Sequence, residues 1–512
     1  MVVATADTDA SNLARLSGRF GAGIRIWPVT RAEVLRVLEA RFAEALLDAA
    51  TFTLERRYPE FSARSVITAG QAVAFGLVAA LTALAFCVAP AVANWVLTIA
   101  LSLAFIANAL FRILLVWIGA MKPQNPAMPL SSADASHLPR YSVIVPLHKE
   151  ANVVTGLIRA LRALDYPPDR LEVALVLEAD DRETIAAVEA EPFDPRFFVL
   201  HVPPGSPRTK PKAANYALGF VRGEFTVIYD AEDRPEQDQL LKAVAAFRSL
   251  PQTVACLQAR LNFYNARENW LTRMFALDYA LWFDFLLPGL DKYCIPMPLG
   301  GTSNHFRTEA LRAIAGWDPC NVTEDADIGI RLAQLGLRVT TLDSTTFEEA
   351  TVTLGIWLRQ RSRWMKGYMQ TWLVHMRTPL RLLRQSGPRG FFGFQLFVGG
   401  TFLTALLNPV LWCIWLLTSV RADAATWNFA IQPFAVASLA SVVVGNALFV
   451  YLAILGPWRR GWLDLSPYGL GAPIYWALIS AASYRGLWQL VTRPRHWDKT
   501  RHGMTRHLPV QG

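Results

Sequence analysis

Clusters of acidic residues follow three segments of the sequence that have the composition of buried β-strands. These segments are residues 140–148, 171–179 and 223–233, and a helical pattern over residues 151–164 separates the first two. Such alternation predicts a mainly parallel sheet, in which the carboxyl ends of the strands meet at one edge and bind ligands. The polar residues at these ends are His148, Glu150, Glu178, Asp180, Asp181, Asp230, Glu232 and Asp233. One acidic strand end could be a helix cap, but three in register predict a binding site.

Carboxylates gathered in one crevice repel each other unless a cation lies among them. Oxygen ligands favour Mg²⁺ or Mn²⁺, and such an ion commonly carries the phosphates of a substrate, so a nucleoside diphosphate is the expected ligand. The sequence contains no GxxxxGK[ST] or GxGxxG motif, which excludes a P-loop and a dinucleotide fingerprint. The cationic groups left to bind phosphate are Lys210, Lys212 and the arginines of residues 359–364.

Residues 359–364 read RQRSRW and precede an apolar part of the chain by about thirty residues. Arg and Lys gather at cytoplasmic membrane ends and Trp lies at headgroup level, so the segment could be a membrane anchor. Guanidinium groups also bind phosphate oxygens, and an indole offers a flat face to a sugar ring. These six residues by themselves leave both interpretations open.

The composition indicates a protein that is part membrane and part aqueous domain. Of its 512 residues 53% are hydrophobic and only 18% are charged, with a net charge of +9. The positive charge suits anionic lipids or an anionic substrate, and the lack of a basic-aromatic motif argues against nucleic acid as a partner. The five cysteines are scattered, which predicts neither a zinc site nor a disulfide framework.

Four apolar segments contain no Asp, Glu, Lys or Arg and predict two transmembrane hairpins: residues 68–90, 91–111, 394–420 and 424–458. Arg112 and Lys122 follow the second segment, and other basic residues flank the same ends of the hairpins. This bias predicts that the central domain and both termini are cytoplasmic, in an integral protein of a bacterial inner membrane. The first apolar segment begins only at residue 68, so no cleaved signal peptide is expected.

Two other segments are expected to form membrane-associated helices. Residues 31–57 have amphipathic helical spacing that could pack on protein or on lipid. Residues 467–484 are apolar but interrupted by Pro and Gly, which predicts a re-entrant or interfacial helix. The predicted divisions are residues 1–66, 67–120, 121–350, 351–392, 393–458 and 459–512: an N-terminal segment, a hairpin, the α/β domain, interfacial helices, a second hairpin and a basic tail region.

The order of the motifs resembles that of membrane-embedded family 2 glycosyltransferases with a GT-A fold, a group that includes cellulose, hyaluronan and chitin synthases. The motifs are PLHKEANVV, LVLEADD, KPKAANYAL, YDAED, TEDADIGIRL and QRSRW, within residues 139–375. The resemblance implies an α/β GT-A cytoplasmic domain with a mainly parallel sheet and an α-helical transmembrane region with interfacial helices. It also implies a nucleotide-sugar donor.

Displacement of a nucleoside diphosphate from a sugar needs a metal on the leaving group and a base on the attacking hydroxyl. By resemblance Asp230 and Glu232 match the DxD metal motif, with Glu in place of the second Asp, so Asp233 is an alternative ligand. Asp325, the last residue of the Thr323-Glu324-Asp325 motif, matches the catalytic base. A helix N-cap is the alternative reading of Asp325.

The resemblance assigns the remaining positions to donor, acceptor and gate. The donor side comprises His148, Glu150, Glu178 or Asp180 for the nucleoside, and Lys212, Arg361 and Arg363 for phosphate. Acceptor contacts fall on Gln360, Trp364, Gly301 and Thr302, although residues 300–305 lack the FFCGS-type sequence of cellulose synthases. Trp497, Lys499 and Thr500 match a gating segment in position and type, or form a plain basic tail.

The expected function is inverting, metal-dependent transfer of a sugar, from a UDP-sugar, to a growing β-linked polysaccharide at the membrane, with room for export or accessory subunits. Glycosylation of a membrane lipid by the same chemistry is the alternative. A receptor or scaffold with a degenerate transferase domain is a third reading, which the intact acids and the RQRSRW segment argue against.

Overall fold

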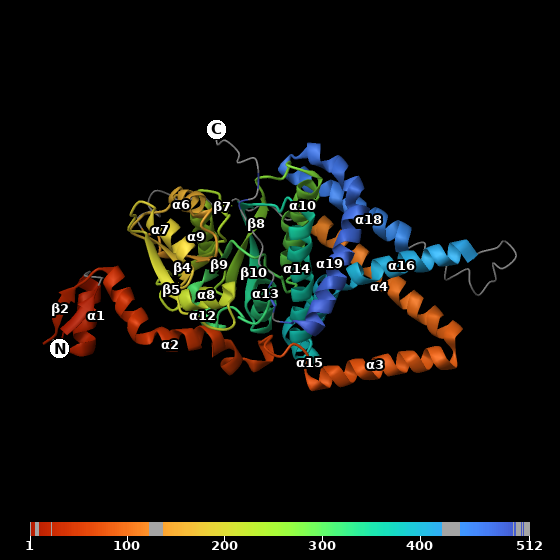
Figure 1. Cartoon of the computed structure of the whole chain (residues 1–512), viewed down its shortest axis with the longest axis horizontal. Coiled ribbons are helices and arrows are strands. Elements are labelled where there is room, and N and C mark those ends of the chain that lie inside the picture. Colours follow the sequence, from red (N-terminus) through yellow and green to blue (C-terminus); the bar gives the residue numbers. More distant parts are fainter. Residues whose placement is uncertain are drawn as a thin grey trace.

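A computed structural model describes residues 2–5, 10–21, 23–121, 137–421, 441–494, 496–497, 503 and 505. Figure 1 shows an α/β domain beside a group of long helices, with the N-terminus at the far side of the α/β domain. Helix α14 (Leu354–His375), which follows the last strand, lies between these two parts.

The α/β domain is built on an eight-stranded sheet of order β5-β4-β3-β6-β9-β8-β10-β7. Strands β5, β4, β3 and β6 are parallel, β9 is antiparallel to β6 and β8, and β8 is parallel to β10. The expected mainly parallel sheet is confirmed. The strands are β3 (Tyr141–Leu147), β4 (Leu171–Glu178), β5 (Phe197–Val202), β6 (Phe225–Ile228), β7 (Arg234–Pro235), β8 (Val254–Phe263), β9 (Asn304–Arg307) and β10 (Arg338–Glu348).

Helices cover both faces of this sheet, which is why β3, β4 and β6 are apolar along almost their whole length. One apolar core joins β3 and β4 to α6 (Val154–Arg162) and α9 (Gln239–Ser249). The opposite face packs on α8 (Lys210–Leu218), α12 (Thr308–Ala313) and α13 (Glu324–Gln334). Helix α7 (Arg182–Glu189) follows β4.

The N-terminal region consists of β1 (Val2–Thr5), α1 (Ala10–Phe20), β2 (Arg25–Pro28) and α2 (Arg31–Arg57). The small parallel sheet of β1 and β2 was not predicted. Helix α2 has the predicted bounds and packs on protein: Arg31 lies 2.9 Å from Glu172, and Asn215 donates to the carbonyl of Ala50 at 3.1 Å.

The first predicted hairpin is present as α3 (Ala69–Val88) and α4 (Pro90–Met121). Arg112, expected just after the second span, lies inside α4. The helix continues because the residues after Arg112 are again apolar, and they pack on α11 (Leu287–Lys292). A positive charge therefore lies within a helix that is long and apolar enough to cross a membrane.

The next helical run consists of α15 (Pro379–Phe394), a π-helical turn η3 (Gln395–Gly399) and α16 (Gly400–Arg421). Within the part of the chain that the structure describes, three helical segments are long and apolar enough to cross a membrane: Ala69–Val88, Pro90–Met121 and Pro379–Cys413. The predicted turn at residues 421–423 and much of the fourth span lie outside the described residues. The described part of that span is η4 (Ser441–Gly445) and α18 (Asn446–Leu455).

Residues 467–484, predicted to form a re-entrant or interfacial helix, are divided between a 3-10 segment and an α-helix. Pro467, Gly469 and Gly471 belong to a 3-10 segment, η6 (Leu463–Gly471), which follows a shorter one, η5 (Gly456–Arg460). Helix α19 (Ala472–Thr492) then runs without a break, because Pro473 lies in its first turn, where no intrahelical N–H bond is lost. Helix α19 packs on α14 (Leu354–His375), which carries the RQRSRW residues, and on α16.

A bent helix joins the sheet to the membrane helices. It comprises α10 (Trp270–Leu281), a π-helical turn η2 (Trp282–Leu286) and α11, and it contacts α4 and α18. Two hydrogen bonds from Arg460 to the buried carboxylate of Asp284, at 2.6 and 2.8 Å, hold η2 against η5. This bent helix forms one wall of the cavity described below.

Candidate active site

The acids after β6 form a compact network with Lys210, which opens α8. Lys210 makes an ion pair with Asp230 and donates to the carbonyl of Gly301 at 2.6 Å. The backbone N–H of Asp230 donates to Asp233 Oδ2 at 2.7 Å, and the hydroxyl of Thr302 donates to the same oxygen. Lys210 and Thr302 therefore connect the carboxyl end of β6 to the loop that precedes β9.

Asp233 is fully buried, and its Oδ1 has no hydrogen-bond partner among the described residues. Burial, with the nearby charges of Asp230 and Glu232, raises the pKa of Asp233 well above its usual value. Glu348 at the end of β10 shares the environment, since burial and the same acids raise its pKa as well. We call Asp230, Glu232, Asp233 and Glu348 the acidic face. Burial and mutual repulsion therefore disfavour the charged forms of Asp233 and Glu348 on this face.

The acidic face was tested as a cation site. Within the described ranges, no three His, Cys, Asp or Glu side chains come together as a metal site on their own. The surplus of carboxylate and the unpartnered Asp233 oxygen nevertheless fit a divalent ion, provided that a substrate supplies further oxygen ligands.

A second set of charges lies at the ends of β4 and before α8. The amine of Lys212 is fully buried, 3.6 Å from Glu178, and burial raises the pKa of Glu178 and lowers that of Lys212. Arg208, which was not predicted, lies 2.9 Å from Asp180 and 3.8 Å from Glu178. Lys212 thus contacts Glu178, and it is Lys210 that contacts the acidic face.

The end of β3 is organised by Asp181. This residue accepts a hydrogen bond from the N–H of Thr184 at 3.4 Å and caps α7, as expected for one acidic strand end. His148 lies 3.7 Å from Asp181, and the N–H of Glu150 donates to the hydroxyl of Thr184 at 3.1 Å. His148 and Glu150 are thereby tied to the same strand edge as Glu178.

The predicted base lies in the first turn of α13. Asp325 Oδ1 accepts from the N–H of Ala326 at 2.7 Å, while the N-cap position belongs to Thr323. A Cβ on Gly301 would lie 3.1 Å from Asp325 Oδ2, so the glycine leaves this oxygen open. Helix α14 passes close by, since a Cβ on Gly367 would lie 2.2 Å from the Thr323 hydroxyl.

Glu324 and Asp325 share a buried, charged environment. Burial, reinforced by Asp325, raises the pKa of Glu324 to about 8. Burial also raises the pKa of Asp325, whereas the positive charges of Lys210 and Arg363 lower it. Burial thus disfavours the charged form of both carboxyls, and the positive charges of Lys210 and Arg363 oppose that effect.

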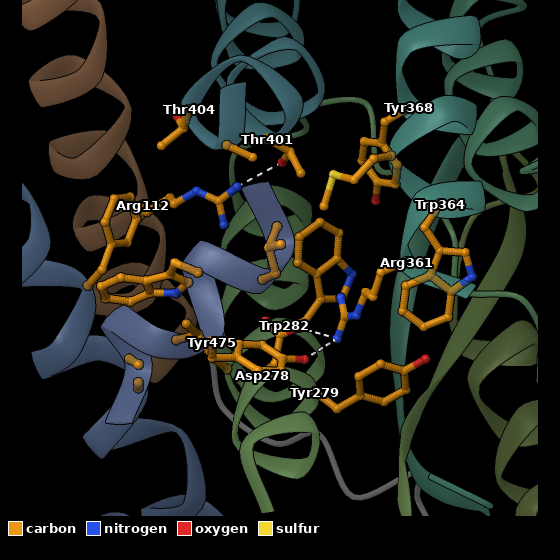
Figure 2. Close-up of a pocket in the computed structure, with 18 of the residues that line it drawn as sticks. Arg112, Asp278, Tyr279, Trp282, Arg361, Trp364, Tyr368, Thr401, Thr404 and Tyr475 are labelled. Carbon is orange, nitrogen blue, oxygen red and sulfur yellow. Dashed lines mark hydrogen bonds and ion pairs between the residues drawn. The ribbon is translucent and has the colours of Figure 1, made fainter. Parts of the chain in front are cut away.

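The two arginines of the RQRSRW segment point to different places, because residues two apart lie on different faces of a helix. Arg361 Nη2 donates to Asp278 at 2.6 Å and to the hydroxyl of Tyr475 at 2.7 Å (Figure 2). Arg363 lies on the side of Glu324 and Asp325, with Trp497 against its guanidinium at 4.7 Å. Arg361, which was predicted to contact the diphosphate, makes an ion pair with Asp278 and lines the cavity described below.

Trp364 stacks on Tyr279, with ring centroids 6.1 Å apart, and lies 4.7 Å from the guanidinium of Arg361. The side-chain oxygen of Gln360 is buried without a partner among the described residues. The C-terminal tail runs along α14, where Lys366 donates to the carbonyl of His496 at 2.6 Å. Of the predicted gating residues, Lys499 and Thr500 lie outside the described residues.

A cavity of about 220 Å³ lies between the α/β domain and the membrane helices (Figure 2). Asp325 and Gly301 line it on the side of the α/β domain, whereas Thr302 does not. Trp364 and Tyr279 form an aromatic wall. The membrane helices contribute Asn108, Arg112, Thr401, Thr404, Asn408, Asn446 and Ser480. Asp325 is therefore shared by the acidic face, through Lys210, and by the cavity.

Comparison with known proteins gives a family match over residues 225–482, to the family described as glycosyl transferase family group 2. The β-monoglucosyldiacylglycerol synthase of Synechocystis sp. is 31% identical over 49% of this chain and 53% of its own length. The probable glycosyltransferase YdaM of Bacillus subtilis is 26% identical over 47% and 58%, and the probable glucomannan 4-beta-mannosyltransferase 6 of Oryza sativa is 27% identical over 46% and 42%. The chain thus spans about half the length of the curated relatives it matches.

Among solved structures, the mannosyltransferase PcManGT from Pyrobaculum calidifontis, in complex with GDP-Man and Mn²⁺, aligns over 77% of this chain and 99% of its own, with 23% identity and a TM-score of 0.45. The S. aureus TarS structure in complex with UDP-GlcNAc aligns over 68% and 92%, with 16% identity and a TM-score of 0.32.

Proposed function

Because this chain belongs to glycosyl transferase family group 2 and its α/β domain has the GT-A fold, we propose that it transfers a sugar from a nucleotide sugar on the acidic face to the hydroxyl of a lipid acceptor in the cavity. The observation that carries the proposal is the position of Asp325, with Lys210 and Arg363 on one side and the cavity on the other. Family membership and the intact acids leave no support for the scaffold interpretation.

In the proposed reaction the acceptor hydroxyl attacks the anomeric carbon of the donor sugar. The carbon–oxygen bond to the diphosphate breaks, and the electron pair leaves with the nucleoside diphosphate. The hydroxyl proton passes to the Asp325 carboxylate, whose ionised form the positive charges of Lys210 and Arg363 favour. A single in-line displacement inverts the configuration of the anomeric carbon.

The leaving diphosphate gains negative charge as the bond breaks, and the structure offers cationic groups for it. Arg363 presents a guanidinium fork beside Asp325, and Lys210 lies between Asp230 and Gly301. Asp230, Glu232 and Asp233 would hold Mg²⁺ or Mn²⁺, which would supply further positive charge to the diphosphate. Glu178, Asp180, Arg208, His148 and Glu150 would contact the nucleoside.

A lipid acceptor is favoured by the walls of the cavity. Helices α4, α16, α18 and α19 supply most of the side opposite Asp325, so an acceptor held there has access to the bilayer. The similarity to a β-monoglucosyldiacylglycerol synthase supports this class of acceptor. Trp364 would stack on the acceptor group next to the base.

Elongation of a β-linked polysaccharide is the second candidate. The stacked pair Trp364 and Tyr279 is a surface that suits a pyranose ring, and one relative is named a glucomannan mannosyltransferase. Gly301 and Gln360 would then contact the acceptor chain. A donor screen with candidate UDP- and GDP-sugars, with diacylglycerol vesicles or β-linked oligosaccharides as acceptors, separates the two.

The size of the radiolabelled product decides between glycolipid and polymer. Asp325→Asn is the matched control for that screen, since it keeps the shape of the side chain but cannot accept the proton. The proposal would be contradicted if the wild type released nucleotide no faster than Asp325→Asn with every donor and acceptor.

We also propose that the protein lies in a bacterial inner membrane with its catalytic domain and both termini in the cytoplasm. Charge bias at the helix ends supports this orientation. In a variant without native cysteines, a cysteine at position 422 should react with an impermeant reagent from outside, and a cysteine at position 194 should not. Labelling at position 194 in sealed cells would reverse the assigned orientation.

A further inference from the structure

Arg112 is a half-buried arginine inside membrane helix α4, and its side chain lines the cavity (Figure 2). Its Nε donates to Asn108 Oδ1 at 3.2 Å, and its Nη2 donates to Thr401 Oγ1 at 2.8 Å. Both acceptors are neutral. Among the described residues no carboxylate lies within ion-pair distance of Arg112, and no partner is found for its Nη1.

The neutral partners hold the guanidinium in a fixed position. Asn108 Nδ2 donates to the carbonyl of Leu396 at 2.5 Å, which leaves its Oδ1 to accept from Arg112. The Thr401 hydroxyl donates to the carbonyl of Phe397 at 2.6 Å, so its lone pairs also face Arg112. The close contact of α4 with α16 requires Gly400, where a Cβ would lie 1.9 Å from Asn108 Nδ2.

The other charged residues of the cavity have oppositely charged neighbours at close range. The charged lining residues are Arg112, Arg361, Asp278 and Asp325. Arg361 is paired with Asp278 at 2.6 Å, and Asp325 has Lys210 and Arg363 beside it. Among the described residues Arg112 has no ion-pair partner: its guanidinium lies over the rings of Phe397 and Phe449, and Asp278 acts on it only from beyond ion-pair distance. An unpaired charge in a membrane-level cavity is costly, so such residues usually mark a ligand site.

We propose that Arg112, with Asn108 and Thr401, binds the anionic phosphate of a phospholipid, which places the lipid headgroup in the cavity facing Asp325. A guanidinium with a free edge matches a phosphate oxygen better than it matches a neutral hydroxyl. Thr404 and Asn408 line the same cavity and would contact the polar remainder of the headgroup. This inference rests on the proposed function, because it takes the cavity as the acceptor site, and it narrows the acceptor to an anionic lipid.

Lipid binding to the purified, full-length protein in a neutral detergent tests the site without turnover. Native mass spectrometry would compare short-chain phosphatidylglycerol, diacylglycerol with the same chains, and inorganic phosphate. The wild type should bind phosphatidylglycerol at least about tenfold more tightly than diacylglycerol, since hydrogen bonds to a charged group are worth that factor or more. Equal affinities, or displacement of phosphatidylglycerol by equimolar inorganic phosphate, would overturn the inference.

The variants locate the effect. Arg112→Gln should remove the preference, and Arg112→Lys should keep part of it. Asn108→Asp places a carboxylate beside Arg112 and should also remove the preference, which covers the case in which Arg112→Gln does not fold. Arg384→Gln, at an exposed arginine of α15, is the control and should bind like the wild type. A preference that survives both Arg112→Gln and Asn108→Asp would contradict the site.

The same proteins separate this inference from the proposed function. If the wild type prefers phosphatidylglycerol but transfers no sugar, the site stands and the proposed reaction fails. If sugar is transferred to neutral diacylglycerol and anionic lipid is not preferred, the reaction stands and the Arg112 site fails.

Discussion

The acidic face of the α/β domain and the cavity among the membrane helices lie on either side of Asp325, and they carry opposite excesses of charge. On the acidic face, Asp233 and Glu348 are buried carboxyls for which Lys210 is too little compensation. In the cavity, Arg112 is a cation whose hydrogen bonds among the described residues go to an amide and a hydroxyl, with no carboxylate at ion-pair distance. The comparison teaches that each region is incomplete in a way that its proposed ligand would complete: a cation with a diphosphate on one side, a phosphate on the other.

Removal of divalent cations should have the largest effect and should affect only the acidic face. EDTA should reduce sugar transfer to background, and Mg²⁺ or Mn²⁺ should restore it, because the clustered carboxylates need an ion to accept a diphosphate. Binding of phosphatidylglycerol in the same EDTA buffer should not change. Full transfer in EDTA would remove the metal from the proposal.

Asp325→Asn should leave both ligand sites intact but stop proton transfer between them. We expect kcat to fall by about 10²-fold or more, the usual size of a general-base contribution. Donor binding, measured by calorimetry with the unreacted nucleoside diphosphate, should stay within a few-fold of the wild type. Normal turnover would exclude Asp325 as the base.

The two arginines of α14 offer a direct comparison of the regions. Arg363→Lys should lower kcat/KM for the donor at least about tenfold, or about 1.4 kcal/mol, because Lys has no guanidinium fork. Arg361→Lys should instead raise KM for the acceptor, because Arg361 is bound to Asp278 and Tyr475 in the cavity wall. Steady-state kinetics with each substrate varied in turn would measure both, and the opposite assignment of effects would break the comparison.

The smallest effect expected is a shift of the pH profile. Activity should be lost as pH falls through the pKa of Asp325, because the base must be ionised. The Arg363 charge lowers that pKa, so Arg363→Gln should move the loss to higher pH. Arg363→Lys keeps the charge and should leave the profile of kcat/KM in place. An unchanged profile in Arg363→Gln would mean that Arg363 does not act on the base.

Much of the α/β domain could be predicted from local sequence. Strands β3, β4 and β6 are apolar runs that end in acids, and parallel pairing places those acids at one edge whatever the rest of the chain does. Glu348 was missed because it ends β10, whose last residues are mostly polar and therefore lack the apolar run by which the other strands were predicted. Arg208 was missed although it stands two residues before Lys210 in the same basic segment.

Two helix boundaries in the apolar part of the chain could not be predicted from the sequence. Arg112 interrupts an otherwise apolar run and has the pattern of a span boundary, but the helix continues to Met121. Residues 467–484 were predicted to form a re-entrant or interfacial helix, and their Pro and Gly residues fall before α19 or in its first turn. In both cases the place where a helix begins or ends depends on its packing partners.

By itself the sequence determined the mainly parallel sheet, the acids at its edge, the apolar helices and the positions of Asp325 and the RQRSRW segment. These features are local, because they depend on the spacing of apolar residues and on the residues at strand ends and turns. The tertiary structure decided which partner each charged side chain has. Arg361 pairs with a residue 83 positions away, and Arg112 is held by a residue 289 positions away. No local pattern encodes these contacts. They separate the roles of Arg361 and Arg363, two residues apart, and they leave Arg112 without an ion-pair partner among the described residues.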